Sequence, residues 1–304
     1  MINRLIIVLF FLVHQGFSQR SKTTITVLGT TQDAGAPQLS CEKECCASLS
    51  LKEQNRRKGS SMALRLGDTA ATFLFDASPD ITLQWNALIQ REQNTLAGIF
   101  LTHAHMGHYA GLLYLGREAW NSDQIPVYVM PRMKAFIEDN APWEQLLVLE
   151  NIRLKQLESN RAIPLGLGVK VTPVLVPHRD EYSETVAYWI QGPTKSALYL
   201  PDIDKWEHWK TPIEEWIAKV DYAFLDATFF DATEVPGRSM DEIPHPFVVE
   251  SVKRFAGLSP AEKKKIYFIH INHTNPLLNP GSSEYQKLID EGFLIAERGM
   301  EFSL

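Results

Sequence analysis

Short apolar segments rich in β-branched residues recur along the chain between turn residues, a pattern typical of β-strands. In the first part of the chain this pattern predicts strands at residues 24–28, 62–66, 72–75, 98–101 and 127–130. Further strands are predicted at residues 169–176, 185–190, 197–200, 222–225, 266–271 and 293–296. Apolar residues spaced as on one helix face predict helices at residues 81–91, 109–115, 212–220, 246–256 and 283–291.

The order of these elements predicts how they pack. In each half of the chain, strands able to pair as antiparallel hairpins come first, and strand–helix units follow. This order predicts an α+β fold, an αββα sandwich of two mixed sheets packed face to face with helices outside. No composition break or Ser/Gly-rich linker divides the halves, so residues 19–304 are expected to form a single domain.

The first eighteen residues have the features of a secretory signal peptide. Arg4 precedes an unbroken apolar run at residues 5–13, and Gly16 and Ser18 are small residues before a cleavage point ahead of Gln19. The alternative is a membrane anchor, but about 20 apolar residues are needed to span a bilayer. We therefore expect residues 1–18 to be removed and the protein to be secreted or periplasmic, without a stable membrane anchor.

Composition and charge narrow the classes of partner. With 45% hydrophobic and 22% charged residues, the chain has the composition of a globular protein. The formal net charge of −6 becomes −7 once Arg4 leaves with the signal peptide. Nucleic-acid binding needs clustered positive charge, and the only basic run is residues 263–265. We expect a small-molecule substrate and no nucleic acid, and both a monomer and a homodimer remain open.

Three histidines follow one predicted strand within six residues: His103, His105 and His108. Because side chains alternate along an extended strand, His103 and His105 point to the same side. His108 falls in the first turn of the next helix, which can fold back over the same point. Imidazole is a good ligand for Zn, Fe and Mn. This spacing predicts a metal site rather than a His-rich surface loop.

Three more residues with metal-binding side chains also follow predicted strands: His178, Asp202 and His270. A single His at a strand end is usually a hydrogen-bonded residue at the rim of a sheet. Together with the strand that precedes His103, however, four strand ends carry such residues. Four of them at one edge of a sheet favour a shared metal centre.

Residues 103–108, His-Ala-His-Met-Gly-His, resemble the HxHxDH signature of the metallo-β-lactamase fold superfamily. The later ligands of that superfamily are matched in order by His178, Asp202 and His270. Residues 226–229, 237–240 and 270–276 resemble the DGTF, GRxM and HINNTNP segments of the PqqB family, which serves pyrroloquinoline quinone biosynthesis. The chain also resembles the PhnP phosphodiesterases of phosphonate metabolism. These resemblances cover residues 24–300 and imply the metallo-β-lactamase-type αββα sandwich.

One departure from the signature concerns the second metal site. Gly107 stands where the superfamily has an Asp that, by resemblance, binds the second metal. The resemblance leaves a first site of His103, His105 and His178 with Asp202, and a second site of His108, Asp202 and His270. PqqB proteins commonly keep the Asp-His pair and lose the first two His, so this chain differs from both branches. If the backbone φ at residue 107 is negative, Gly107→Asp is expected to strengthen the second site.

The three cysteines lie within six residues: Cys41, Cys45 and Cys46. PhnP-like enzymes carry a structural zinc held by a CxCxxC cluster and a final HxxH, and residues 270–273 supply HxxH here. The resemblance therefore implies a structural zinc bound by Cys41, by Cys45 or Cys46, and by His273. A disulfide with one free thiol is the alternative in an exported protein.

His245 follows Asp226 by nineteen residues, where phosphodiesterases of this fold place a His that protonates a leaving group. The alternative is a surface His between two prolines. The leading prediction for function is an exported metal-dependent hydrolase of a small ester or phosphodiester. In it, Zn, Mn or Fe activates a water, Asp202 orients that water, and His245 is the acid. The alternatives are a PqqB-like, iron-dependent oxidative enzyme and a non-catalytic metal-binding relative.

Overall fold

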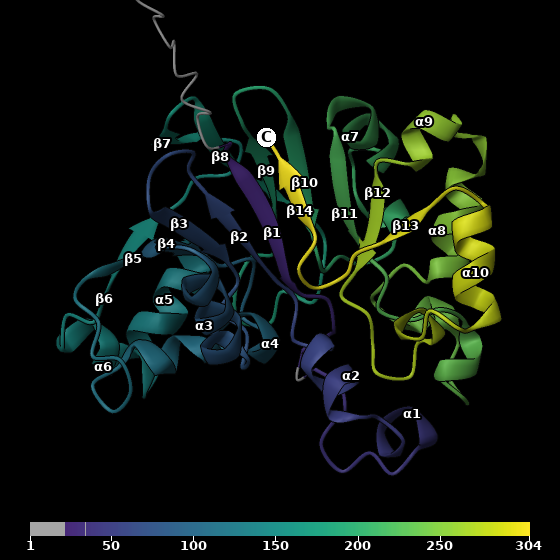
Figure 1. Ribbon diagram of the computed structural model, residues 1–304, viewed down its shortest axis with the longest axis horizontal. Coiled ribbons are helices and arrows are strands. Elements are labelled where there is room, and N and C mark those ends of the chain that lie inside the picture. Colours follow the sequence, from purple (N-terminus) through teal and green to yellow (C-terminus); the bar gives the residue numbers. More distant parts are fainter. Residues whose placement is uncertain (1–21, 34) are drawn as a thin grey trace, which may run out of the picture.

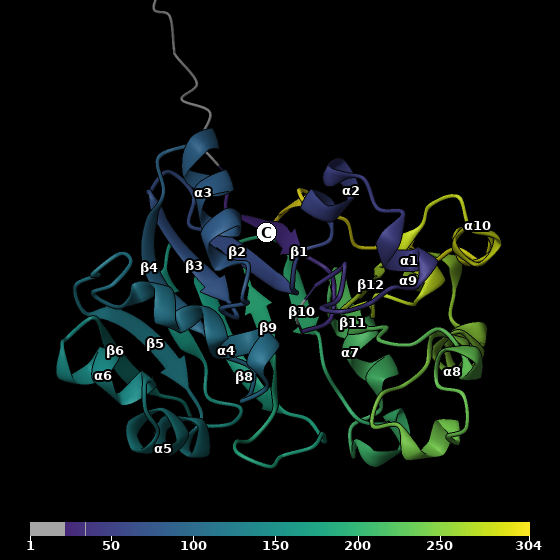
Figure 2. The same cartoon turned by 90° about the horizontal axis from the view of Figure 1, so that it is seen from below.

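The computed structural model describes residues 22–33 and 35–304, so the predicted signal peptide lies outside the described residues. Two seven-stranded sheets pack face to face, and helices cover the outer face of each sheet (Figures 1 and 2). The predicted αββα sandwich is therefore confirmed. Within the described part of the chain, no helix is both long and apolar enough to cross a membrane.

The first sheet has the strand order β14-β1-β2-β3-β4-β5-β6. Its strands β14, β1, β2 and β3 pair as antiparallel neighbours, whereas β3 to β6 are parallel. The bounds of these strands are β1 Thr24–Gly29, β2 Ser61–Arg65, β3 Ala71–Phe75, β4 Thr95–Phe100, β5 Ile125–Val129, β6 Ile152–Gln156 and β14 Glu301–Ser303.

The second sheet repeats this plan in the order β13-β12-β11-β10-β9-β8-β7. Strands β7 to β10 pair as antiparallel neighbours, and β10 to β13 are parallel. The bounds are β7 Ile163–Gly166, β8 Val169–Leu175, β9 Val186–Gln191, β10 Ser196–Leu200, β11 Tyr222–Asp226, β12 Ile266–Ile269 and β13 Leu294–Ile295.

The helices divide between the two sheets (Figure 1). The first sheet is covered by α3 Ile81–Arg91, α4 Met106–Tyr109, α5 Pro131–Asp139, α6 Trp143–Val148 and the 3-10 helix η1 Ala110–Leu115. The second sheet is covered by α7 Ile213–Lys219, α8 Val248–Arg254, α9 Pro260–Lys263 and α10 Ser283–Asp290. Two short helices, α1 Glu44–Ala47 and α2 Leu51–Arg56, project from one end of the sandwich.

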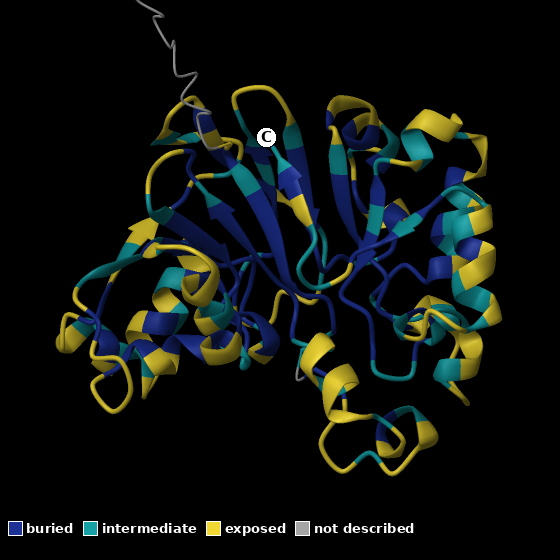
Figure 3. Ribbon diagram, in the orientation of Figure 1, coloured by how far each residue is buried: buried dark blue, intermediate teal, exposed yellow. Residues whose placement is uncertain are grey.

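Aromatic side chains between the sheets fix the strand ends that carry the polar residues. The strands are the most buried part of the molecule (Figure 3). Phe75 at the end of β3 stacks on Phe100 at the end of β4, with ring centroids 5.2 Å apart. Phe100 stacks in turn on Tyr128 at 4.2 Å. Since Phe75 and Phe100 are fully buried, their packing holds the residues that follow them in a defined position.

The pattern did not reveal several elements. No element was predicted in residues 131–166, where α5, α6, β6 and β7 lie, and β14 was also missed. Strands β6, β7 and β14 are edge strands that bury few side chains, so their sequences lack the apolar pattern of the inner strands. Residues 110–115, predicted as part of a helix, form the 3-10 helix η1.

Candidate metal centre

The residues predicted as metal ligands of the His/Asp centre all lie at one edge of the sandwich, in the loops that follow β4, β8, β10 and β12 or in α4. Parallel strands bring their carboxyl ends to the same edge of a sheet, which is where ligands bind in sheets of this kind. In chain order these residues are His103, His105, His108, His178, Asp202 and His270.

The first cluster contains His103, His105, His178 and Asp202, whose ligand atoms all lie within 4.8 Å of one another. His103 Nε2 is 2.8 Å from His105 Nδ1 and 3.3 Å from Asp202 Oδ2. His178 Nε2 is 3.3 Å from Asp202 Oδ1. Three imidazoles and one carboxylate therefore converge on one point, as the sequence predicted.

A second cluster lies beside the first. His108 Nε2 is 3.3 Å from His270 Nε2, and each of these nitrogens is 3.8 Å from Asp202 Oδ2. Asp202 is only 2% exposed, and its two oxygens reach both clusters. It is thus placed to be shared between two metal ions.

In three of these rings, those of His103, His108 and His270, the Nδ1 atom has a hydrogen-bond partner that fixes the position of its proton. Thr102 Oγ1 lies 2.9 Å from Asp76 Oδ1, which can only accept, so the hydroxyl donates there and accepts from His103 Nδ1 at 3.0 Å. Asp76 Oδ2 accepts from His108 Nδ1 at 2.8 Å. Thr228 Oγ1 donates to a carboxylate and accepts from His270 Nδ1 at 2.9 Å. Nε2 is therefore the nitrogen that each of these three rings can offer to a metal, an arrangement usual around metal-bound His.

The centre fits a divalent cation for a second reason. Among the described residues, buried atoms without a hydrogen bond include His178 Nε2 and Asp202 Oδ1, both in the first cluster. Such atoms cost free energy unless a ligand satisfies them. The facing Nε2 lone pairs of His108 and His270 repel each other unless a proton or a cation lies between them. Three imidazoles with a carboxylate suit Zn, Fe or Mn.

Burial and neighbouring charges shift the protonation of the centre. Burial lowers the pKa of His178 to about 4, and it holds the pKa values of His103 and His270 well below their usual range. Burial alone would raise the pKa of Asp202, but the imidazoles around it, His178 first, hold it well below its usual range. Burial opposes the charged form of His108, but the Asp76 carboxylate raises its pKa to about 9. Within the first cluster, the His103 and His178 imidazoles are therefore neutral and Asp202 is a carboxylate at neutral pH.

The place expected for the missing Asp is taken by a residue that the sequence reasoning did not include. The ligand atoms of Asp33, His108 and His270 lie within 4.8 Å of one another. A Cβ atom at residue 107 would lie 2.3 Å from Asp33 Cα and 2.7 Å from Asp33 Oδ1. The prediction that Gly107→Asp strengthens the second site is therefore wrong, because a side chain at residue 107 collides with the backbone of Asp33.

His245 is buried beside the centre and is not a surface residue. Its Nδ1 donates to Asp226 Oδ2 at 2.8 Å and lies 3.1 Å from Asp202 Oδ1. Burial opposes the charged form, but the two carboxylates raise the pKa of His245 to about 10. An imidazole that is protonated at neutral pH beside the centre suits the predicted role of an acid.

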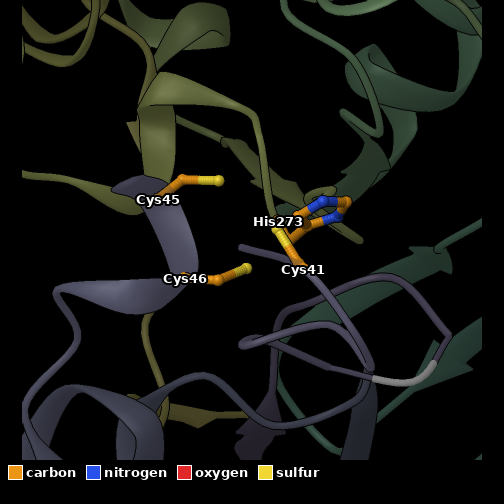
Figure 4. A group of neighbouring side chains, drawn as sticks. All are labelled: Cys41, Cys45, Cys46 and His273. Atoms are coloured by element: carbon orange, nitrogen blue, oxygen red, sulfur yellow. The ribbon is translucent and has the colours of Figure 1, made fainter. Parts of the chain in front are cut away.

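A separate cluster joins the cysteines to His273 (Figure 4). Cys45 and Cys46 come from α1, Cys41 from the loop before it, and His273 from the loop after β12. The four ligand atoms lie within 4.8 Å of one another, and all three cysteines are free in the described structure. His273 Nδ1 hydrogen-bonds Asn272 Oδ1, so Nε2 is the nitrogen available to a metal. Three thiols and one imidazole form the ligand set of a closed structural zinc site.

Comparison with known proteins agrees with this geometry. Residues 71–271 match the model of the Beta-lactamase superfamily domain. The chain is 27% identical over 312 residues to coenzyme PQQ synthesis protein B of Methylorubrum extorquens, covering 92% of this chain and 99% of that protein. It is 28% identical over 316 residues to the protein of the same name from Nitrosococcus oceani, with the same coverage.

Two solved structures share the fold. The structure of Zn(2+)-bound PqqB from Methylobacterium extorquens has a TM-score of 0.76 and 24% identity, covering 92% of this chain and 100% of that chain. A diphosphatase from the PhnP family has a TM-score of 0.67 and 24% identity, covering 93% of this chain and 97% of that chain.

Proposed function

Because the chain belongs to the beta-lactamase superfamily, we propose that it is a metal-dependent hydrolase acting on a small phosphodiester or other ester. The observation that supports this proposal most directly is the complete first cluster of three imidazoles, which shares Asp202 with the second cluster. Three protein ligands that leave a further position for water are the usual arrangement at catalytic zinc. A divalent cation at such a site lowers the pKa of a bound water to about 7 and polarises a phosphoryl or carbonyl oxygen.

Two residues beside the metal would orient the water and protonate the leaving group. Asp202, ionised at neutral pH, would accept a hydrogen bond from the attacking water and orient it. His245 would give its proton to the leaving oxygen and would be held in position by Asp226, the acceptor of its Nδ1 proton at 2.8 Å. Positioned proton donors of this kind typically contribute about 10²–10⁴-fold to a rate.

Zinc is the metal that we propose for the centre, with Mn and Fe as alternatives. The fold relative from Methylobacterium extorquens was solved with zinc bound, and imidazole with carboxylate is a common zinc ligand set. We also propose a structural zinc at the Cys41, Cys45, Cys46 and His273 cluster, which would tie the loop before α1 to the loop after β12.

A second candidate is favoured by the full-length relatives, which are coenzyme PQQ synthesis proteins. In this alternative the centre holds Fe(II) and serves a PqqB-like oxidation of a peptide or quinone precursor. Three imidazoles with open positions also suit Fe(II). His103 and His105 are the residues at which this chain departs from the PqqB pattern described above. Because both belong to the first cluster, this departure favours the hydrolase over the second candidate.

One experiment separates the two candidates. The purified protein would be loaded with Zn, Mn or anaerobically with Fe(II), and assayed both for hydrolysis of bis(p-nitrophenyl) phosphate and for oxygen consumption with a panel of peptides and quinols. We expect metal-dependent hydrolysis that is absent in a His178→Ala control. Oxygen consumption that needs Fe(II), without hydrolysis by any loaded form, would contradict the hydrolase proposal and favour the second candidate.

We further propose that the protein acts outside the cytoplasm, because residues 1–18 have a charged start, an apolar core and a small-residue exit. Export would argue against a role in cofactor assembly. N-terminal sequencing of the protein recovered from a periplasmic or culture fraction would test this, with Gln19 as the expected first residue. An intact residue 1 in the cytoplasmic fraction would contradict it.

A further inference from the structure

The side chain of Asp33 lies beside the second cluster, and one of its carboxylate oxygens has no hydrogen-bond partner among the described residues. Asp33 follows β1, and its Oδ1 is a buried atom that makes no hydrogen bond within the described part of the chain. The carboxylate lies within 4.8 Å of the ligand nitrogens of His108 and His270. The Nδ1 atoms of both rings are already bonded to Asp76 and Thr228, so Nε2 is the nitrogen that each ring can offer to a metal.

Backbone hydrogen bonds fix the loop that carries Asp33 against the strand end that carries His270. Ile271 N donates to Thr30 O at 2.8 Å, and Gln32 N donates to Ile271 O at 3.0 Å. On the other side of the loop, Thr31 N donates to Lys58 O at 2.9 Å. The two bonds made by Ile271 lie within three residues of Asp33 and next to His270, so they hold the two backbone segments side by side.

Gly107 is complementary to Asp33. Its φ lies outside the left-handed region, so backbone conformation does not require glycine there. Space does require it, because a Cβ at residue 107 would lie 2.3 Å from Asp33 Cα. Asp33 itself has a φ of 38°, a conformation that Asp tolerates better than most residues. The loop after β1 therefore places the Asp33 carboxylate in the space that a side chain at residue 107 would otherwise fill.

We propose that Asp33 is the carboxylate ligand of a second divalent metal ion, bound together with His108 and His270 and sharing Asp202 with the first ion. The absence of a side chain at Gly107 is what admits this ligand. The inference rests on the metal centre of the proposed function but not on its reaction. It gives this chain a two-ion centre although the Asp of the HxHxDH signature is missing.

Metal titration tests the proposal without an activity assay. The chelator-treated, reduced protein would be titrated with Co(II) and followed by calorimetry and by absorbance, which separates the thiolate-bound ion of the cysteine cluster from the others. We expect two ions at the His/Asp centre of the parent. In Asp33→Asn, which keeps the size and removes the charge, the second ion should bind at least tenfold more weakly.

The matched control is Asp80→Asn. Asp80 Oδ2 accepts a hydrogen bond from Gly59 N at 2.9 Å, and it lies 3.4 Å from the point where a Cβ of residue 35 would be. Asp80 therefore supports the same loop, but it is not part of the group of ligand atoms around His108 and His270. We expect this variant to bind both ions as the parent does. Equal loss of the second ion in both variants would mean that loop packing, not ligation, is the role of Asp33, and would overturn the proposal.

A spectroscopic variant distinguishes a ligand from a structural residue. In Asp33→Cys the new thiol should bind the second ion and add sulfur-to-Co(II) charge-transfer absorbance beyond that of the cysteine cluster. Absence of added absorbance, unchanged binding in Asp33→Asn, or a single ion at the His/Asp centre of the parent would each overturn the proposal. Full metal stoichiometry without hydrolysis would instead count against the proposed function alone.

Discussion

Asp76 is the buried residue on which the orientation of the centre depends, so Asp76→Asn is an informative perturbation. Its Oδ1 accepts from Thr102 N at 2.8 Å and from Thr102 Oγ1 at 2.9 Å. Its Oδ2 accepts from His108 Nδ1 at 2.8 Å and from Tyr199 OH at 3.2 Å. Asn keeps the size of Asp and also tolerates the φ of 65° found at this position. The backbone is therefore expected to stay in place.

The amide cannot satisfy both sides of the site. If its oxygen faces Thr102, its NH2 group faces His108 Nδ1, which must then give up its proton. His108 would carry that proton on Nε2, the nitrogen that faces His270. If the amide is flipped, its NH2 group meets the backbone N–H of Thr102 instead. Loss of a group that orients a metal ligand typically costs about 10–100-fold in metal affinity, or about 1.4–2.8 kcal/mol.

We therefore expect Asp76→Asn to weaken binding at the site that includes His108 by about 10–100-fold. Binding at the site of His103 and His178 should change less, because the Oδ1 contact to Thr102 can be kept. Calorimetric titration of the apo protein with Zn would measure both affinities. Asp221→Asn is the control, since Asp221 accepts from Ser196 N near the start of β11, away from the centre. Unchanged affinity of both ions in Asp76→Asn would refute the reasoning.

Three further predictions concern the other parts of the centre. His178→Ala should lower the affinity of the first ion by more than the ~100-fold expected for an orienting group, and it should abolish hydrolysis. If mass spectrometry shows that the variant retains all of its metal, His178 is not a ligand. Cys46→Ser should destabilise the fold by about 2 kcal/mol, roughly 4–8 °C in Tm for a domain of this size, with little change in metal at the His/Asp centre; an unchanged zinc content and Tm would contradict the structural-zinc proposal. His245→Gln should slow hydrolysis of alkyl phosphodiesters by about 10²–10⁴-fold but hardly affect p-nitrophenyl esters, whose leaving group needs no proton. Equal losses on both substrate types would argue against an acid role.

Local sequence patterns were sufficient to find most of the fold and many of the centre's residues. Inner strands bury side chains on both faces, so they appear as short apolar runs, and the residues that end them can be located to within a position or two. His103, His178, Asp202 and His270 were found in this way, because each directly follows such a run. The edge strands β6, β7 and β14 were missed because they bury too little surface to leave a pattern.

The tertiary structure alone determined which residues complete the centre. Asp33 lies in a loop 74 residues before Gly107 in the sequence. Only the folded chain brings the two together, so closely that a Cβ atom on residue 107 would lie 2.3 Å from Asp33 Cα. The position of Asp76 beside His108 and the burial of His245 against Asp226 likewise depend on contacts between separate strand ends. Periodicity reports which face of an element is buried. It carries no information about which distant backbone fills the space beside that element, and this is why the sequence predicted a deficient second site where the structure places a carboxylate.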